Sequence, residues 1–543
     1  MLPIIFKYKN LFAALILFLG SVLSMLQVLR GAWPQNHEMD SFIRWTLLYA
    51  AHQTKLDLFP IWSMSDNYFF GGPSPLLYHK VFYFISALFQ NLFNNNQISI
   101  ILAVLFFLFI GSVFMYILLL DLTKSWHVSL FGGLVFIFCN YTFTNWFIRG
   151  AMAEFSFAML FPLILYLVYC YSIKNKYSFW LGLSMGIGFL AHSSVFYFMI
   201  LSLAPFLLFH FIIYKDLKNF FRLSFGFLIP TLPYIFLIWQ LRGSFGLNNI
   251  LIYRPQNEFV PTLNYFWDSG YVFGDRWDDF TVVLDKVILI LLLIIFVRLI
   301  FIALAKKEIL NKRVNHFEKY LLISLLFYGI LQLPLSKAFY LTFPGAQYLQ
   351  FPWRLLSLLL PIVILLICIM LNRFFNRNST LIIVSLLLPI HLFLAPNFKL
   401  IDYPRMEISS LKIDSNTNWI SEETGAYYPQ GLSLPTVNSN LYFENADLNN
   451  CKIQNGSFIP GDLSRSFTFS CSKTENILFP MVFSEFFDIS FNLDNQPKFQ
   501  EIEFVEQSGY LSVLLPSGTG ELKVQAPTMF RALLKTLFFN NFN

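Results

Sequence analysis

The sequence predicts a polytopic α-helical membrane protein that ends in a small β domain. Hydrophobic residues make up 56% of the 543 positions and charged residues only 13%, whereas soluble proteins average about 25% charged residues. Long apolar runs recur up to residue 395, most of them close to the length of a bilayer-spanning helix. After residue 396 the composition becomes polar and the apolar residues alternate in short runs. The positions of the Lys and Arg residues in the loops are more informative than the net charge of +6, because they set the orientation in the membrane. The net charge gives no support for nucleic-acid binding.

The first apolar run, residues 11–30, follows Lys7 and Lys9 and has some features of a signal peptide. It is as long as a membrane-spanning helix, and no small-residue cleavage site follows before Trp33. We therefore expect an uncleaved first span.

Ten further apolar runs bring the predicted number of spans to about eleven. The runs lie at about residues 99–121, 128–146, 155–172, 179–190, 195–214, 221–241, 282–304, 320–333, 352–371 and 380–395. The two shortest, 179–190 and 320–333, are the weakest of these predictions. Residues 81–93 have one apolar face and also contain Gln90 and Asn91, so they predict a helix that lies in the membrane interface.

The Lys and Arg residues of the short loops fix the expected orientation. If the N-terminus is inside and the spans alternate, every Lys/Arg-rich short loop falls on the inner side, as the positive-inside rule requires. These residues are Lys124, Lys174, Lys176, Lys215, Lys218, Arg222, Lys306, Lys307, Lys312, Arg313, Lys319, Arg373 and Arg377. The outer side then receives the first loop (residues 31–97), a second long loop (242–281) and the whole C-terminal segment.

The C-terminal segment, residues 397–543, predicts a small, mostly β domain outside the cytoplasm, which follows a transmembrane domain of residues 1–396. Its alternating runs include "LYFENA", "SFTFSC", "FDISFNL" and "GYLSVLLPSGTGELKVQA". Cys451 and Cys471 share this segment, and a disulfide between them is an option outside the cytoplasm. The other three cysteines lie in or beside apolar runs, where we expect packing roles. The last residues, 530–543, are too short to span and predict an interfacial helix.

The chain contains no P-loop, no glycine-rich dinucleotide pattern, no HExxH and no CxxC. Several stretches instead resemble those of membrane glycosyltransferases of the GT-C class, in particular the bacterial YfhO-like group that is also described as related to 6-pyruvoyl-tetrahydropterin synthase. They are "HEMDSFIRW" and "LFPIWSMSDNYFFGGPSPLLYHK" in the first loop, "RGAMAEFSFAMLFPLIL", "FLAHSSVF", "QYLQFPWRLL", "AYYPQ" and "GYLSVLLPSGTGELKV". Two departures stand out: Arg44 occupies the place of a histidine usual in the group, and the Tyr-Pro-Pro-Leu end of the group's first loop is "PLLYHK" here.

The resemblance implies a GT-C-like fold and transfer of a sugar from a polyprenyl-phosphate donor to an extracytoplasmic glycan, lipid or protein. Asp40 would act as the general base or hold a divalent cation, Mg or Mn, at the donor phosphate. Glu38 is the second candidate, although residues at i and i+2 do not share a helix face. The alternative role of Asp40 is that of N-cap of a helix starting at Ser41.

Further outer residues are candidates for binding the substrate. Arg149 and Arg354 could hold a phosphate through the planar guanidinium group. The alternatives are an ion pair between Arg149 and Glu154 and a headgroup anchor made by Arg354 and Trp353. His79 and Lys80 are further candidates for a phosphate contact, and the alternative is that Lys80 snorkels to the membrane surface. His192 is another candidate, and its alternative role is that of a packed histidine. Trp267 and Asp268 could bind a sugar, or Trp267 could belong to an interfacial aromatic belt.

Two other functional classes stay open at this point: a transporter or flippase for a lipid-linked glycan, and a non-catalytic protein of envelope assembly. A transporter should show ionisable residues at mid-membrane depth or paired broken helices. For all three classes we expect a multi-pass protein of a bacterial inner membrane, with its N-terminus in the cytoplasm and its C-terminal domain outside.

Overall fold

The structure is a computed structural model that describes residues 2–30, 33–34, 38–64, 71–241, 285–304, 315–349, 351–398, 405–406, 446–448, 450–455, 463–494, 500–507 and 510–539. The chain divides into two compact units. Unit 1 comprises Met1–Phe42, Asn95–Thr231 and Ile252–Ser410, and unit 2 comprises Ile43–Asn94, Leu232–Leu251 and Leu411–Asn543. Unit 2 thus joins most of the first predicted outer loop to the C-terminal segment.

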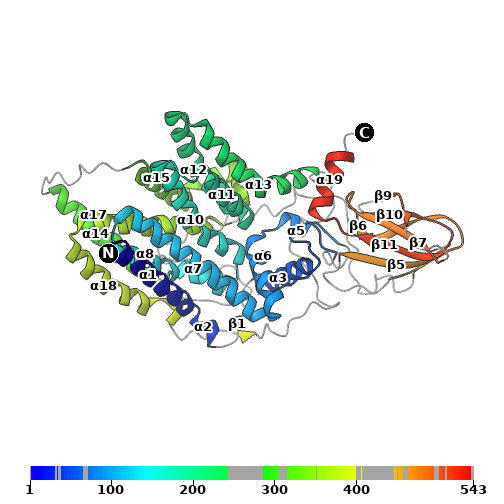
Figure 1. The fold of residues 1–543 in the computed structure, drawn as a ribbon, viewed down its shortest axis with the longest axis horizontal. Helices are drawn as coiled ribbons and strands as arrows, with labels where there is room; N and C mark the ends of the chain where they lie inside the picture. Colours follow the sequence, from blue (N-terminus) through cyan, green and yellow to red (C-terminus); the bar gives the residue numbers. More distant parts are fainter. Residues whose placement is uncertain are drawn as a thin grey trace. The chain divides into compact units, whose positions relative to one another are not determined.

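Unit 1 is a bundle of α-helices (Figure 1). Its main helices are α1 (Leu2–Ser24), α2 (Leu26–Leu29), α7 (Asn96–Thr123), α8 (Trp126–Ile137), α9 (Asn140–Phe143), α10 (Met152–Lys174), α11 (Ser178–Ala191), α12 (Ser193–Tyr214), α14 (Lys286–Leu304), α15 (His316–Leu331), α16 (Lys337–Thr342), α17 (Leu356–Phe374) and α18 (Arg377–Leu394). α13 (Leu217–Leu241) begins in unit 1 and ends in unit 2. The π-helix η1 (Thr144–Arg149) continues α9, and the short 3₁₀ helices are η5 (Pro334–Ser336), η6 (Ala346–Leu349), η7 (Pro352–Leu355) and η8 (Pro396–Phe398). A two-residue strand, β1 (Trp33–Pro34), pairs antiparallel with β2 (Arg405–Met406).

Each of the eleven apolar runs contains a helix, which confirms a multi-pass membrane protein. Six helices among the described residues are long and apolar enough to cross a bilayer, and the number rises to eight if each of two bent pairs forms one span. The bent pairs are Trp126–Ile137 with Asn140–Arg149, at 41°, and His316–Leu331 with Pro334–Thr342, at 85°. The described apolar parts of α1, α11 and α14 are shorter than a bilayer-spanning helix. The structure therefore supports six to eight spans, fewer than the eleven expected from hydropathy.

The centre of unit 1 is α17, which is buried along almost its whole length and contacts α7, α8, α10 and α15. Small residues allow close approach elsewhere in the bundle. A Cβ atom at Gly182 of α11 would lie 1.9 Å from the Leu223 carbonyl oxygen, and one at Gly226 of α13 would lie 2.2 Å from the Phe179 oxygen. Such backbone contact is a common way for membrane helices to associate, because van der Waals packing replaces the hydrophobic effect there.

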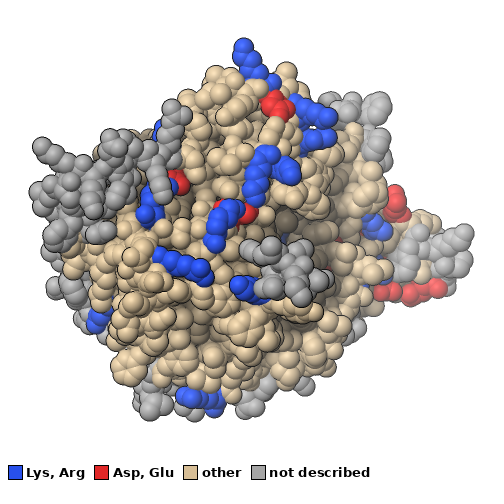
Figure 2. Space-filling model, turned by 60° about the vertical axis from the view of Figure 1, so that its left-hand side comes forward, with Lys and Arg blue, Asp and Glu red and all other residues tan. Residues whose placement is uncertain are grey.

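Basic residues at several helix ends of unit 1 lie on the surface and pair with nearby acids. Lys174 and Lys124 both contact Asp121, and Arg373 pairs with Glu318 at 2.7 Å. Figure 2 shows a face on which Lys and Arg outnumber Asp and Glu across an otherwise uncharged surface. Lys124, Lys174 and Arg373 belong to loops expected on the inner side.

The helical part of unit 2 contains most of α3 (Met39–Thr54), α5 (Ser74–Leu77) and α6 (Val81–Phe93). The rings of Trp45 and Tyr78 stack with their centroids 4.8 Å apart and join α3 to the end of α5. α6 has the bounds predicted for an interfacial helix; it buries Phe82 and Tyr83, and it exposes Leu92.

The β domain of unit 2 consists of two antiparallel sheets followed by a helix. The strands are β3 (Ala446–Leu448), β4 (Cys451–Asn455), β5 (Ser464–Cys471), β6 (Glu475–Val482), β7 (Asp488–Leu493), β8 (Gln500–Glu501), β9 (Phe504–Gln507), β10 (Tyr510–Leu515) and β11 (Gly518–Gln525). Six strands follow the order β3-β4-β5-β11-β7-β8 and three the order β6-β10-β9. Phe467 and Phe479 pack between the two sheets, with ring centroids 4.9 Å apart. The C-terminal helix α19 (Met529–Phe539) confirms the helix expected there.

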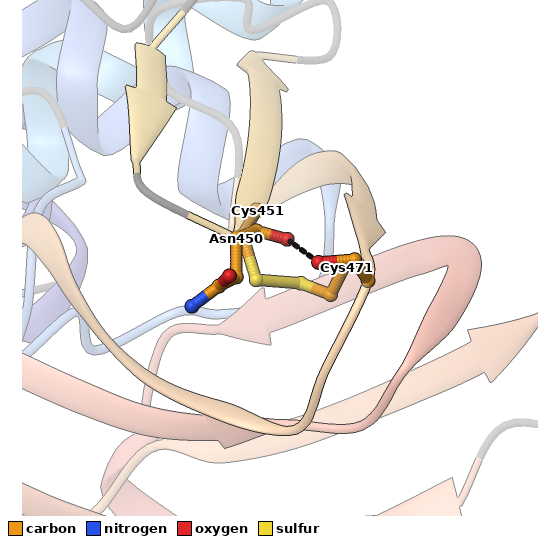
Figure 3. The surroundings of a disulfide bond; sticks show 4 residues. Asn450, Cys451 and Cys471 are labelled. Carbon is orange, nitrogen blue, oxygen red and sulfur yellow. Dashed lines mark hydrogen bonds between the residues drawn. A yellow bond between two sulfur atoms is a disulfide. The ribbon is translucent and has the colours of Figure 1, made fainter.

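Cys451 and Cys471 form a disulfide that joins β4 to β5, where the two residues face each other in the register (Figure 3). The Ser472 backbone N–H next to it donates to the Asn450 carbonyl oxygen at 2.8 Å. A disulfide fits a domain outside the cytoplasm, because the cytoplasm keeps thiols reduced. The predicted strand "LYFENA" lies outside the described residues apart from Ala446, whereas the other three predicted runs fall on strands.

The expected orientation can be tested by labelling single cysteines. Cys139, Cys170 and Cys368 are buried, so they should react little in the folded protein. We expect a cysteine at exposed Lys176, beyond the end of α10, to react with a membrane-impermeant maleimide only after cells are permeabilised. A cysteine at exposed Lys473, in the β domain, should react in intact cells. Labelling of Lys176→Cys in intact cells would contradict the orientation.

Candidate functional site

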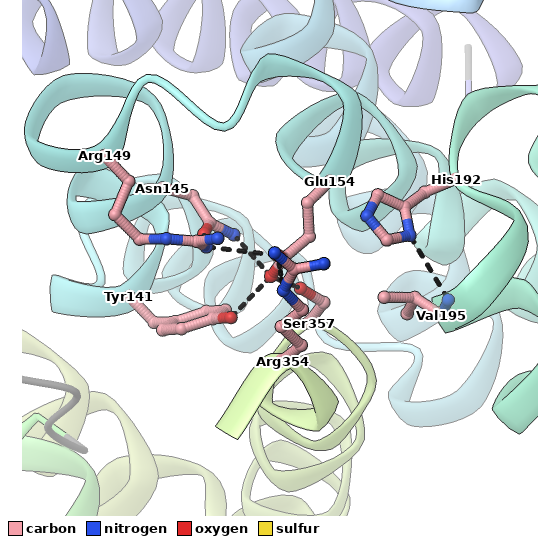
Figure 4. Close-up of polar contacts among 8 residues, drawn as sticks. All are labelled: Tyr141, Asn145, Arg149, Glu154, His192, Val195, Arg354 and Ser357. Atoms are coloured by element: carbon pink, nitrogen blue, oxygen red, sulfur yellow. Dashed lines mark hydrogen bonds and ion pairs between the residues drawn. The ribbon is translucent and has the colours of Figure 1, made fainter. Parts of the chain in front are cut away.

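A buried polar cluster surrounds Glu154 in the first turn of α10 (Figure 4). Its Oε2 atom lies 3.1 Å from Nη1 of Arg149 and 3.5 Å from Nε of Arg354. Its Oε1 atom accepts hydrogen bonds from the Tyr141 hydroxyl and from Ser357 Oγ, the latter at 2.9 Å. Glu154 is 1% exposed. A carboxylate buried to this extent needs such a set of charged and polar partners, because it has lost its hydration.

The bend between α8 and α9 brings three of these partners to one place. Tyr141, Asn145 and Arg149 follow one another at intervals of four residues, so they share one face of the helix formed by α9 and η1. Asn145 donates to Glu154 Oε1 at 3.4 Å and accepts from Arg149. Gly150 then ends the helix at a φ of +71°, a conformation that glycine adopts without a Cβ penalty. π-Helical turns are frequent at functional sites.

Arg354 reaches the cluster from η7, which begins at Pro352 directly before α17. The guanidinium carbon of Arg149 lies 4.3 Å above the ring of Trp353, a cation–π contact. The ion pair between Arg149 and Glu154, which is the alternative role predicted for Arg149, is present in the structure. Glu154 also binds Arg354, so sequence motifs about 200 residues apart meet in one site.

Glu38 is the first-loop acid that the structure places at this cluster. Its backbone N–H donates to the Arg149 carbonyl oxygen at 3.0 Å, and its carboxylate interacts electrostatically with both Arg149 and Arg354. Asp40 is the second residue of α3, which starts at Met39, so the prediction that Asp40 is the N-cap is wrong. An acid in this first turn still interacts favourably with the helix dipole. The Asp40 side chain lies outside the part that the structure describes.

His192 lies between α11 and α12, on the side of Glu154 opposite to Arg149 (Figure 4). Its Nδ1 atom accepts a hydrogen bond from the Val195 backbone N–H at 3.2 Å and so caps α12. Burial and the charges of Arg354 and Arg149 hold the pKa of His192 well below its usual range. The ring is therefore neutral at pH 7, and because Nδ1 accepts, its proton is on Nε2.

Lys80 and His79 belong to unit 2. The Lys80 ammonium donates to the carbonyl oxygens of Leu76 and Tyr78, at 2.9 and 2.6 Å, and lies 4.5 Å above the Tyr234 ring. It thereby closes the end of α5 and is buried rather than snorkelling to the surface. The His79 ring is half-buried against Tyr78. Trp267 and Asp268 lie outside the described residues.

A small cavity adjoins the cluster on the side of Tyr141, Asn145 and Ser357, and it has room for no more than about one water molecule. Within the described ranges no group of His, Cys, Asp or Glu side chains could hold a metal ion. The predicted cation at Asp40 stays a prediction, because that side chain is not described.

Several residues of the site were not foreseen from the sequence: Tyr141, Asn145 and Ser357 at Glu154, and Asp285 below α9. For the first two a signal exists, namely the four-residue spacing that ends at Arg149. Ser357 and Asp285 carry no such signal, because their contacts join distant parts of the chain.

No protein-family model matches this chain, and no curated protein matches it either. The resemblance to GT-C glycosyltransferases therefore stays a prediction that depends on the quoted motifs.

Neutralising Glu154 should strongly destabilise unit 1. In Glu154→Gln two buried arginines lose a charged partner, and we expect a loss of about 3–5 kcal/mol in the free energy of unfolding, measured by denaturant titration in detergent. Asp121→Asn is the control, since it breaks partly exposed pairs with Lys174 and Lys124 and should cost about 1 kcal/mol. Equal losses would show that Glu154 is no more important than an ordinary surface pair.

Lys80 should make stability depend on pH. Burial lowers the pKa of its ammonium to about 7, whereas an unfolded lysine has a pKa of about 10.4. Between these values the unfolded chain binds more protons, so the stability of the wild type rises with pH relative to Lys80→Met. We expect the melting-temperature difference to shift by a few degrees in favour of the wild type between about pH 7 and about pH 9.5. A constant difference over this range would contradict the lowered pKa.

Proposed function

We propose that this protein is a membrane glycosyltransferase of a bacterial inner membrane. It transfers a sugar from a polyprenyl-phosphate donor to a glycan, lipid or protein acceptor outside the cytoplasm, within a GT-C-like fold. The observation that supports this proposal best is the meeting of two buried arginines with Glu154 at helix ends, with Glu38 beside them.

The two arginines suit a lipid-linked phosphate at a membrane surface. Glu154 fixes their positions before a ligand arrives, which reduces the entropy lost on binding. Arg354 is the more available of the two: its side chain is 11% exposed, and its Nε lies 3.5 Å from Glu154 without forming a hydrogen bond. Its Nε–H is therefore available to a phosphate oxygen while the ion pair with Glu154 is kept. A guanidinium offers a phosphate two parallel N–H donors.

Carboxylates and His192 supply the proposed general base, the cation site and a further hydrogen-bond donor. The acceptor hydroxyl attacks the anomeric carbon, its proton passes to a carboxylate, and the C–O bond to phosphate breaks, so that polyprenyl phosphate leaves with the electron pair. Glu38, or Asp40 in the first turn of α3, is the proposed base, and Asp40 with Mg or Mn is the proposed cation site. Neutral His192 adds an uncharged N–H donor near the arginines.

A second candidate, a transporter of a lipid-linked glycan, gains support from the two bent helix pairs. Broken helices are the typical binding elements of transporters, and one of the pairs, α8 with α9 and η1, contains Arg149. The two functions differ in outcome, because a transporter moves the donor across a membrane without cleaving it.

The test uses purified protein in liposomes with a polyprenyl-phosphate sugar and a soluble acceptor glycan. We expect Arg354→Gln to raise the KM for the donor about 10–100-fold, since a phosphate contact is lost. Glu38→Gln or Asp40→Asn should lower kcat by about 10²-fold or more while leaving KM nearly unchanged.

Arg373→Gln, which removes a partly buried Arg–Glu pair away from the cluster, is the control and should retain activity. If neither acid variant changes kcat, the assignment of the base is wrong. Donor that crosses the bilayer uncleaved would instead favour the transporter.

A further inference from the structure

The segment Asn140–Arg149, formed by α9 and η1, is an arm separated from its neighbours at both ends. At its start the helix axis bends by 41° relative to α8. At its end Gly150 has a positive φ before α10 begins at Met152. These two breaks allow the arm to shift as one piece. Its position therefore depends on the contacts that hold its ends.

This arm carries most of the groups that touch Glu154. Tyr141, Asn145 and Arg149 all bond to its carboxylate. Their positions relative to Arg354 consequently depend on where the arm lies.

Two contacts from elsewhere in unit 1 hold the ends of the arm. At the far end, the Glu38 backbone N–H binds the Arg149 carbonyl oxygen. At the near end, both carboxylate oxygens of Asp285 accept from the Asn140 backbone N–H, at 3.1 and 3.2 Å. Asp285 precedes α14, is 5% exposed and lies 145 residues from Asn140 in sequence.

We propose that Asp285 is a positioning residue that holds the arm and thereby sets the geometry of the Arg149–Glu154–Arg354 site. It replaces a local N-cap: the residue at that position, Cys139, makes no side-chain capping bond. A carboxylate at this place accepts from a backbone N–H in the first turn of α9, and the positive end of the helix dipole stabilises its charge. The expected effect on donor binding rests on the proposed function, whereas the positioning of the arm by Asp285 does not.

The test compares Asp285→Ala with Asp285→Asn in the full-length protein in nanodiscs. Asparagine keeps one carbonyl oxygen that can accept from Asn140, whereas alanine keeps none. Hydrogen–deuterium exchange of peptides covering residues 140–149 reports the arm directly. Binding of decaprenyl phosphate and the KM for the sugar donor report the site.

Asp216→Ala is the matched control. Asp216 also accepts from a backbone N–H, that of Asn219 at 3.1 Å, but it lies at the start of α13 away from the arm. This variant should change neither the exchange of the arm nor binding.

In Asp285→Ala we expect exchange of the arm to rise about tenfold or more, and decaprenyl phosphate binding to weaken about 10-fold. In Asp285→Asn both values should stay within about threefold of the wild type. Unchanged exchange in Asp285→Ala, or an increase spread evenly over all helices, overturns the proposal. If the wild type binds no decaprenyl phosphate while the arm alone responds to Asp285→Ala, the proposed function fails and the positioning by Asp285 stands.

Discussion

The buried charge of Glu154 is the constraint that organises unit 1. A carboxylate with 1% exposure is tolerated only if its partners are already in place, and those partners come from two distant parts of the chain. The bend after α8 directs Tyr141, Asn145 and Arg149 inwards, and Pro352 starts the turn that delivers Arg354 and Ser357. The helix breaks that would weaken an apolar bundle are therefore compensated by one polar cluster.

Hydropathy predicts where the helices are but not how they bend. The apolar runs locate all the long helices, α6 has the predicted bounds, and the strands of the β domain follow the alternating runs. The structure supports fewer spans for two physical reasons: the backbone bends at Phe138 and Cys139 although the sequence stays apolar there, and the described apolar parts of α1, α11 and α14 are shorter than a bilayer-spanning helix. The disulfide followed from the location of two cysteines in one polar segment, although the sequence alone could not establish the pairing.

The site was predicted as scattered residues rather than as an assembly. Arg149, Glu154, Arg354 and His192 were each singled out at a span end, and the structure places all four together. The phosphate contact of Lys80 stays a prediction, and the structure shows its ammonium bound to two carbonyl oxygens in unit 2. Tyr141, Ser357 and Asp285 were missed because a lone polar residue in an apolar run resembles packing until the bend and the long-range contacts are known.

Charge balance indicates which acid has to move when a donor binds. Arg149 and Arg354 are balanced by Glu154 and Glu38, so an added phosphate leaves an excess of negative charge in a poorly hydrated place. Glu154 cannot respond, because several hydrogen bonds and two arginines hold it. Glu38 is only half-buried. Within the proposed function it is the carboxylate able to swing away or to accept a proton, and acceptance of a proton is the task of the base.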